Sequence, residues 1–305
     1  MEIVDSQIHE PQPPKRLDPE KYDEATRLLV NVELAREAID SVGIDVALCF
    51  ASQEFCDAAV ARYPDRFAGA VPYDAIRNAD DLEEKVANFR KRPGNVAIRN
   101  SPGDFVRVEI RPEFVNGEFE RLYTYCEKYN VPLFFSTHGM ANYMEPVIQA
   151  HPGLTIVIDH LGLAQSPVSP RWSASWEKLP NLIALAKYPN VNVKFCGAPT
   201  LSKEKFPYND VWPYLHQIIN AFTPDRLFWG SDYTRMRARP ADEGGFANPP
   251  PRNEWWYYSD VLNYLRDTNE LSASDKEKML GGAIRKVLRW PKVPDGATEP
   301  VALES

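Results

Sequence analysis

Four residues suited to metal binding or acid–base chemistry close short hydrophobic runs of the sequence. They are His9 at the end of IVDSQIH, His138 in PLFFSTH, His160 in TIVIDH and Asp232 in RLFWGSD. Histidine and carboxylate ligands with an open position are typical of catalytic zinc and similar divalent ions. The pattern predicts a metal held by His9, His138 and Asp232, whose bound water is acidified and attacks an acyl carbon. His160 is then free to position or polarise the carbonyl group.

The opening segment carries a polar series on one face. Side chains alternate along a strand, so Asp5, Gln7 and His9 are expected to share a face opposite Val4 and Ile8. Such a series suits the interior of a barrel that becomes polar toward its mouth. The alternative is a surface strand edge that ends in a capping histidine.

Histidines outside this pattern are expected to be structural. His151 precedes Pro152 at a helix end, and His216 lies inside the helical segment VWPYLHQIINAF. Neither follows a strand-like run, so neither is expected to reach the rim where the other histidines converge.

Basic residues near the predicted strand ends are candidates for holding an anionic substrate. By alternation Lys194 shares a face with Asn192 and Cys196 and points into the barrel, where a lysine needs a partner or a substrate anion. Asp232 is one carboxylate with which Lys194 could pair. For the arginines after the last strand, a solvated loop is an equal alternative. The substrate-binding candidates are Arg99, Lys194, Tyr233 and Arg235, and the same loop carries Arg237 and Arg239.

These residues must be positioned by a repeated strand–helix pattern. Apolar, β-branched runs alternate with amphipathic segments about every thirty residues, the length of a βα unit. Eight such units close a barrel more naturally than they build an open sheet, and the sequence has no Gly-x-Gly-x-x-Gly or Walker-type loop. We therefore predict a (β/α)8 TIM barrel over residues 1–290 and a loosely ordered C-terminal tail over 291–305. The predicted strands are Glu2–Asp5, Asp45–Phe50, Phe67–Val71, Asn95–Arg99, Pro132–Thr137, Thr155–Asp159, Asn190–Cys196 and Arg226–Gly230.

Three longer insertions follow predicted strand ends, where barrels build substrate sites and lids. They span 11–23, 101–112 and 233–253. The aromatic cluster Glu254–Tyr258 fits either a lid or packing of the last helices. Residues 272–290 are predicted to form a final helix packed across the barrel.

Composition excludes several classes of protein. The formal net charge is -8 and no Lys/Arg block is present, which argues against nucleic acid as a partner. No apolar run approaches the roughly eighteen residues of a membrane span, and the N-terminus lacks signal-peptide features, so we expect a cytoplasmic protein. The four cysteines show no CxxC spacing and are expected to be reduced thiols. We expect the binding partner to be a small anionic molecule. The sequence is compatible with a homo-oligomer.

The motifs DSQIH, STHG, DHLG, NVNVKFCG, GSDY and MLGGAIRKVL resemble those of the amidohydrolase superfamily over nearly the whole length. The similar branch is the amidohydrolase-related one, which contains pyrone dicarboxylate lactonase, sugar lactonases and aminocarboxymuconate semialdehyde decarboxylase. The resemblance implies metal ligands at His9, His138 and Asp232, with His160 as the catalytic partner.

Gln7 departs from the first motif of that family, which is usually Asp-x-His-x-His. An amide oxygen is a weaker zinc ligand than imidazole, although it can serve a harder ion or bind a metal-bound water. Lactonases of this branch can carry the motif without using a metal. In that case the resemblance makes Asp232 the general base and leaves arginines to hold the substrate.

The sequence thus predicts hydrolysis of a lactone or related acyl bond in a small carboxylated molecule, with water activated by Asp232. This hypothesis has two versions, one with a divalent metal, Zn or Mn, and one without it. In the version with a metal, Gln7 is an additional candidate ligand. One alternative is a metal-dependent, non-oxidative decarboxylase of an aromatic or muconate-type acid. Another is a degenerate barrel that binds a ligand without turnover.

Overall fold

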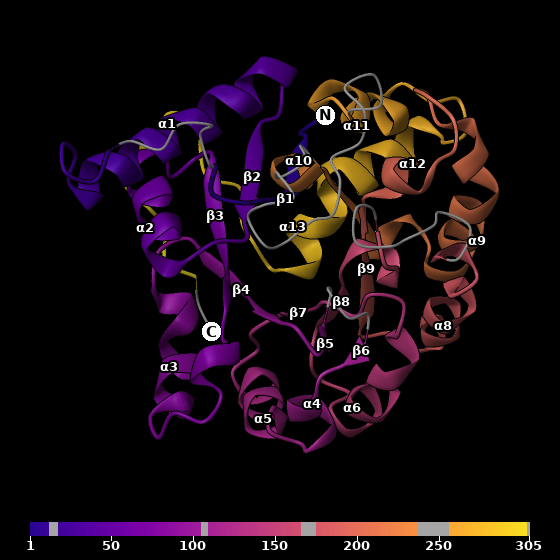
Figure 1. The fold of residues 1–305 in the computed structure, drawn as a ribbon, viewed down its shortest axis with the longest axis horizontal. Helices are drawn as coiled ribbons and strands as arrows, with labels where there is room; N and C mark the ends of the chain where they lie inside the picture. Colours follow the sequence, from indigo (N-terminus) through magenta and orange to yellow (C-terminus); the bar gives the residue numbers. More distant parts are fainter. Residues whose placement is uncertain (12–17, 105–108, 166–174, 237–255, 304–305) are drawn as a thin grey trace.

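The computed structural model describes residues 1–11, 18–104, 109–165, 175–236 and 256–303. Eight parallel strands follow one another around a nearly closed barrel, which confirms the predicted fold (Figure 1). The backbone N–H of Asp232 donates to the carbonyl of Gln7 (3.0 Å), which links the end of the last strand to the first. The strands are β1 Val4–Ile8, β2 Val46–Cys49, β3 Phe67–Pro72, β4 Asn95–Asn100, β7 Leu133–Phe135, β8 Ile156–Ile158, β9 Val191–Cys196 and β10 Leu227–Gly230.

Helices surround the strands (Figure 1). The longest, α1, begins after Asp23, whose carboxylate accepts from the Thr26 backbone N–H, and ends at Gly43 in the left-handed region (φ 75°). The described helices are α1 Glu24–Val42, α2 Gln53–Arg62, α3 Leu82–Asn88, α4 Pro112–Val115, α5 Glu120–Lys128, α6 Glu145–Ala150, α8 Leu179–Ile183, α9 Trp212–Phe222, α10 Tyr233–Met236, α11 Tyr258–Arg266, α12 Ala273–Glu277 and α13 Ala283–Val287.

All eight predicted strands are present, with small shifts at their ends. The largest shift is in β1, which runs to Ile8 instead of ending at Asp5. The insertion after β4 also contains a short antiparallel hairpin that the sequence did not predict, formed by β5 Gly103–Asp104 and β6 Glu109–Ile110.

Two hydrophobic clusters explain the alternation along the strands. One fills the space between the strands and the helices and includes Trp229. The other fills the barrel interior and includes Leu48, Phe134 and Phe228. Because both faces of a parallel barrel strand are buried, the strands read as nearly continuous apolar runs.

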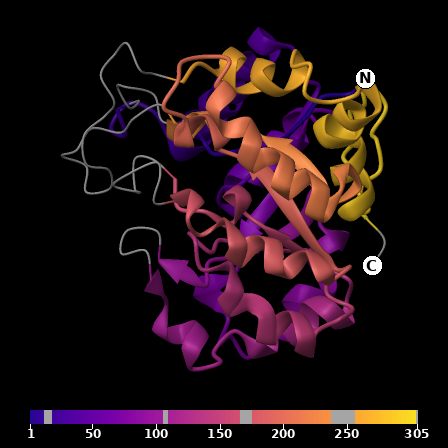
Figure 2. The same ribbon diagram turned by 90° about the vertical axis from the view of Figure 1, so that its right-hand side faces the viewer.

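The amino ends of the strands are closed by the C-terminal part of the chain. Figure 2 shows α13 on the same side of the molecule as the N-terminus. A Cβ at Gly281 would lie 2.7 Å from the Glu2 carbonyl, so glycine permits the close approach to the start of the chain. Near the end of the tail, Leu303 is buried and its N–H donates to the Arg90 carbonyl (2.9 Å), whereas most of residues 291–302 are exposed. The C-terminal part of the chain therefore covers the amino end of the barrel, and the polar residues lie at the opposite, carboxyl end.

The cysteine prediction is confirmed, because all four cysteines are free and buried. Within the described ranges, none of the helices has the length and apolar character needed to span a membrane.

Candidate active site

Three of the four residues expected at the barrel mouth have an unusual backbone conformation. His138 after β7, His160 after β8 and Asp232 after β10 have φ values of 48°, 53° and 52°. Left-handed backbone at a non-glycine residue costs on the order of 1–3 kcal/mol and persists where the surrounding structure enforces it, most often at functional sites. The strand ends predicted from the sequence are thus also the points where the backbone turns sharply.

The alternation predicted for β1 is interrupted. The pairing of β1 with β2 shifts in register between Asp5 and Ile8, as at a β-bulge. Asp5 consequently accepts from the hydroxyl of Tyr258 in the outer helix α11 (2.7 Å), whereas Gln7 reaches His160 at the mouth. The expectation that Asp5 shares one face with Gln7 is therefore wrong, because an irregular strand does not keep a period of two.

Gln7 lies between two imidazoles. Its Nε2 is 3.1 Å from Nε2 of His9 and 3.2 Å from Nε2 of His160. His9 Nδ1 donates to the Phe50 carbonyl (2.6 Å), which leaves the His9 Nε2 lone pair to accept from the amide. Gln7 is fully buried, and its Oε1 has no hydrogen-bond partner among the described residues.

Asp232 faces the same two imidazoles. Its Oδ1 is 3.1 Å from His9 Nε2 and its Oδ2 is 3.9 Å from His160 Nε2. Burial lowers the pKa of His160, which favours the neutral ring. The structure therefore gathers His9, His160, Asp232 and Gln7 into one cluster.

A buried network holds the turn that carries Asp232. Asp5 accepts from the Ser231 backbone N–H (2.8 Å), from the Ser231 hydroxyl and from the Tyr258 hydroxyl. Burial raises the pKa of Asp5 to about 6, although these donors oppose the rise. The sequence showed the polar character of Asp5 but not its partners, which are 226 and 253 residues away along the chain.

Two cations from strands β4 and β9, which are separated by β7 and β8 in the barrel, converge on one carboxylate. Lys194 of β9 and Arg99 of β4 lie 2.6 Å and 3.4 Å from the carboxylate of Asp159, which follows β8. Lys194 is fully buried above the ring of Phe50 (3.8 Å), so its predicted inward direction is confirmed. Its partner is Asp159 and not Asp232. Sequence reasoning missed Asp159, although a carboxylate just before His160 in TIVIDH was a visible signal.

Substrate contact was predicted for both cations, and the structure separates them. The side chain of Lys194 is 0% exposed, whereas that of Arg99 is 21% exposed. Of these two cations, only Arg99 therefore offers part of its surface to a ligand, and Lys194 contacts Asp159 inside the barrel.

His138 has a different environment from the other two mouth histidines. Its Nε2 lies 2.9 Å from the Ser136 hydroxyl, and burial lowers its pKa to about 3. Within the described ranges, no three His, Cys, Asp or Glu side chains are placed to hold one metal ion. The predicted ligand set of His9, His138 and Asp232 is therefore not assembled.

The side chains around Gln7 are not arranged to coordinate a metal ion. A cation would need the Nε2 lone pair of His9, which instead accepts an amide hydrogen from Gln7. The second amide hydrogen is directed at His160 in the same way. The Gln7 amide thus occupies the side of both rings that a cation would require.

The remaining predicted residues are an aromatic residue, the arginines after the last strand and two further histidines. Tyr233 is buried and stacks on Tyr258 (ring centroids 4.0 Å apart). Arg235 lies in α10, but its side chain, like Arg237 and Arg239, is outside the described residues. His151 lies 2.9 Å from carboxylates of Glu120 and Glu127, and His216 lies 2.9 Å from Glu270, which agrees with structural roles.

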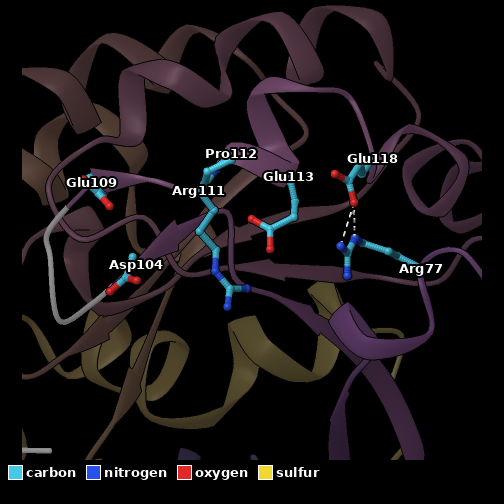
Figure 3. Close-up of a pocket in the computed structure, with 7 residues that line it drawn as sticks. All are labelled: Arg77, Asp104, Glu109, Arg111, Pro112, Glu113 and Glu118. Carbon is cyan, nitrogen blue, oxygen red and sulfur yellow. Dashed lines mark hydrogen bonds and ion pairs between the residues drawn. The ribbon is translucent and has the colours of Figure 1, made fainter.

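A charged cavity of about 510 Å³ lies at the insertion after β4 (Figure 3). Arg77 pairs with Glu118 (2.6 Å) and Arg111 with Asp74 (3.3 Å). Carboxylates outnumber the arginines among the described residues that line it, so it suits an anionic substrate poorly. The lining residues are Arg77, Asp104, Glu109, Arg111, Pro112, Glu113 and Glu118.

Curated relatives of the chain include lactone hydrolases. The 4-sulfomuconolactone hydrolase of Rhizobium radiobacter is 29% identical over 156 residues, which are 47% of this chain and 49% of that protein. The L-fucono-1,5-lactonase of Burkholderia ambifaria is 35% identical over 101 residues, 32% of each chain. The chain spans about half the length, or less, of the curated relatives it matches.

Solved structures match over nearly the whole chain. A candidate 2-pyrone-4,6-dicarboxylic acid hydrolase from Pseudomonas putida has a TM-score of 0.66 at 15% identity, covering 94% of this chain and 97% of that one. A zinc-bound amidohydrolase from Burkholderia multivorans has a TM-score of 0.64 at 18% identity, covering 95% and 100%. A 2,6-dihydroxybenzoate decarboxylase from Rhizobium has a TM-score of 0.56 at 12% identity, covering 94% and 98%. At these identities the similarity shows a shared fold.

The family assignment rests on a match that runs through the barrel. The amidohydrolase family model covers residues 4–290, from β1 to the end of the last helix, and divalent metal sites are common in that family. The chain belongs to the amidohydrolase family.

Proposed function

We propose that the chain hydrolyses a lactone that carries an anionic group, with Asp232 as the general base. The observation that carries this proposal is the Asp232 carboxylate at the barrel mouth, 3.1 Å and 3.9 Å from two imidazole nitrogens. A carboxylate beside proton-accepting rings is suited to moving a proton during acyl transfer. The lactone hydrolases among the relatives support the same reaction class.

The reaction transfers one proton and replaces the bond between the carbonyl carbon and the ring oxygen with a bond to the water oxygen. Asp232 takes a proton from a water molecule as the water oxygen bonds to the lactone carbonyl carbon. The tetrahedral adduct collapses, and the bond between that carbon and the ring oxygen breaks. The ring oxygen receives the proton, so that water and lactone give a hydroxy acid and the carboxylate is restored.

His160 acts as the proton carrier in this scheme. Its Nδ1 donates to Oε1 of Gln165 (3.1 Å), which leaves the single lone pair on Nε2. At rest this lone pair accepts from the Gln7 amide, and it becomes available to a proton from Asp232, 3.9 Å away, when that amide turns aside. Polarisation of the carbonyl, the role expected from the sequence, needs a proton on that nitrogen. His160 therefore takes the proton from Asp232, directly or through one water, and delivers it to the ring oxygen.

The charges around Asp159 favour an anionic substrate. Two cations, Lys194 and Arg99, face this one carboxylate, which leaves one positive charge in excess. The exposed part of Arg99 is the natural contact for a carboxylate or sulfonate on the substrate, and the positive potential also favours the developing oxyanion.

We propose that this hydrolysis does not require a metal, because Gln7 fills the position where a cation would bind His9. A Zn or Mn site built from His9, His138, Asp232 and Gln7 is the competing version of the same hydrolase. Gln7→His distinguishes the two, since it restores an imidazole ligand. We expect the wild type to retain activity after chelation, and Gln7→His to gain bound metal by elemental analysis.

Similarity in fold alone supports the decarboxylase alternative, and none of the contacts between the described residues of the site favours it. The decisive experiment follows acid release by titration with a panel of five- and six-membered lactones, with and without a carboxylate or sulfonate, using chelator-treated protein. We expect turnover only of the anionic lactones. Release of carbon dioxide from aromatic acids, without lactone hydrolysis, would instead identify a decarboxylase, and ligand binding without any turnover would identify a degenerate barrel.

A further inference from the structure

Gln165 lies behind His160, on the side of the ring away from Asp232. Its Nε2 donates to the Cys196 carbonyl (2.6 Å) and to the His160 carbonyl (3.2 Å). Both partners are acceptors, so the amide nitrogen has to face them, and this fixes the orientation of the amide. The remaining atom, Oε1, therefore faces Nδ1 of His160 at 3.1 Å.

The orientation of this amide decides which ring nitrogen of His160 carries the proton. An amide oxygen only accepts, so Nδ1 must donate and Nε2 must keep its lone pair in the neutral ring. The opposite side of the ring agrees, because the amide nitrogen of Gln7 approaches Nε2 as a donor. Two independent amides on opposite sides of the ring thus favour the same tautomer.

The backbone after β9 leaves room for this side chain. Gly197 has φ 79°, and a Cβ at that position would overlap the Gln165 amide. The Thr200 hydroxyl donates to the Gly197 carbonyl (2.8 Å) and fixes the turn. Gly197 closes the motif NVNVKFCG, whereas Gln165 lies outside every motif of the family resemblance, and the turn at Gly197 provides the space that the Gln165 amide fills.

We propose that Gln165 is a positioning residue that holds His160 in the Nδ1–H tautomer, so that Nε2 serves as the proton carrier for Asp232. The inference rests on the proposed hydrolysis for its consequence, but the tautomer itself is a property of the free protein. In the reversed tautomer Nε2–H would point at the donating amide of Gln7, and the nitrogen facing Asp232 could not take up a proton.

The test is an NMR measurement of imidazole nitrogens in the full chain labelled with 15N-histidine. The His160 signals are assigned by their loss in His160→Gln. We expect a protonated, pyrrole-type Nδ1 and an unprotonated, pyridine-type Nε2 in the wild type. Gln165→Met has a similar length but no acceptor, and it should shift His160 to a mixture of tautomers or to the reversed form.

Turnover is measured on the same preparations. Loss of an outer partner of a reactive histidine typically costs about 10–100-fold in activity, and we expect this loss in kcat with little change in KM. Gly197→Ala should give the same change in His160 by displacing the Gln165 amide. The matched control is Gln149→Met. In the wild type the Gln149 amide donates to the Tyr188 hydroxyl at an exposed position, so its loss should leave the His160 signals and kcat unchanged.

Two results would overturn the proposal. One is a His160 ring that stays in the Nδ1–H form in both Gln165→Met and Gly197→Ala, and the other is a changed tautomer with wild-type kcat. The NMR reading needs no substrate, so a wild type inactive on every lactone would contradict the proposed function alone, and the spectra would still decide on Gln165.

Discussion

Two buried carboxylates support the two halves of the mouth, and they are stabilised in opposite ways. Asp159 faces the cations Lys194 and Arg99, whereas the donors to Asp5 among the described residues are the neutral groups of Ser231, Tyr258 and the Gln7 backbone. Each carboxylate lies beside a residue of the proposed proton transfer, since Asp159 precedes His160 in the chain and Asp5 accepts from Ser231, the residue before Asp232. The difference shows that two kinds of polar environment can position neighbouring parts of one site.

The pKa values express this difference. Burial raises the pKa of both carboxyl groups, but at Asp159 the attraction of Lys194 and Arg99 outweighs it and the pKa falls below its usual range. At Asp5 the neutral donors do not outweigh burial, and the pKa is raised to about 6. The Asp159 side should therefore stay ionised at any physiological pH, while the Asp5 side responds to pH.

The largest expected effect comes from removing a cation that pairs with Asp159. Lys194→Met removes the closest cation from the buried Asp159 carboxylate, and loss of one partner of a buried pair costs about 3–5 kcal/mol in the free energy of unfolding. Urea unfolding measures this loss. The control is Lys187→Met, whose exposed pair with Glu145 is screened by solvent and should contribute little to stability. A similar small effect at Lys194 would show that Arg99 alone satisfies Asp159.

The second prediction concerns pH and the Asp5 side. Between pH 3.8, the pKa of an unperturbed aspartate, and about 6, the unfolded chain loses the Asp5 proton while the folded chain keeps it. The contribution of Asp5 to wild-type stability should therefore fall as pH rises through this window, by about 3 kcal/mol, and stay level above it. Asp5→Asn has no such titration, so its stability relative to wild type should rise from pH 4 to pH 7. The exposed Asp225→Asn is the control, and a difference that does not change with pH would contradict the raised pKa.

The smallest effect tests a single donor to Asp5. Tyr258→Phe removes the hydroxyl that donates to Asp5 but keeps the ring that stacks on Tyr233. A hydrogen bond to a charged group contributes about 1.5–3 kcal/mol, so thermal unfolding at pH 7 should show a loss in this range. Tyr257→Phe, at an exposed tyrosine, should show none. Equal stability of the two variants would mean that Asp5 is held without the tyrosine.

Sequence reasoning succeeded where a residue follows a strand. His160 and Asp232 were found because each ends an apolar run, and the carboxyl ends of barrel strands meet at one mouth. The same argument placed His138 at this rim but could not show that its ring pairs with Ser136 instead of joining His9. The direction of a side chain after a strand end depends on the local turn, and a periodic pattern does not contain it.

The residues that the sequence did not reveal depend on contacts between distant segments. The break in β1 separates Asp5 from Gln7, and an alternating pattern cannot register a β-bulge. Gln165 gains its role only because Gly197 follows β9 at the adjacent strand end. Such pairings are set by tertiary packing and leave no local signal in the chain.

The central claim is that Asp232 moves the proton in lactone hydrolysis, and Asp232→Asn tests it most directly. The amide keeps the shape of the carboxylate but cannot accept the water proton, so kcat should fall by about 10²–10⁴-fold. The melting temperature should stay close to wild type, because the amide keeps the size of the carboxylate and because Lys194 and Arg99 pair with Asp159. Turnover of an anionic lactone by Asp232→Asn at the wild-type rate would contradict the account.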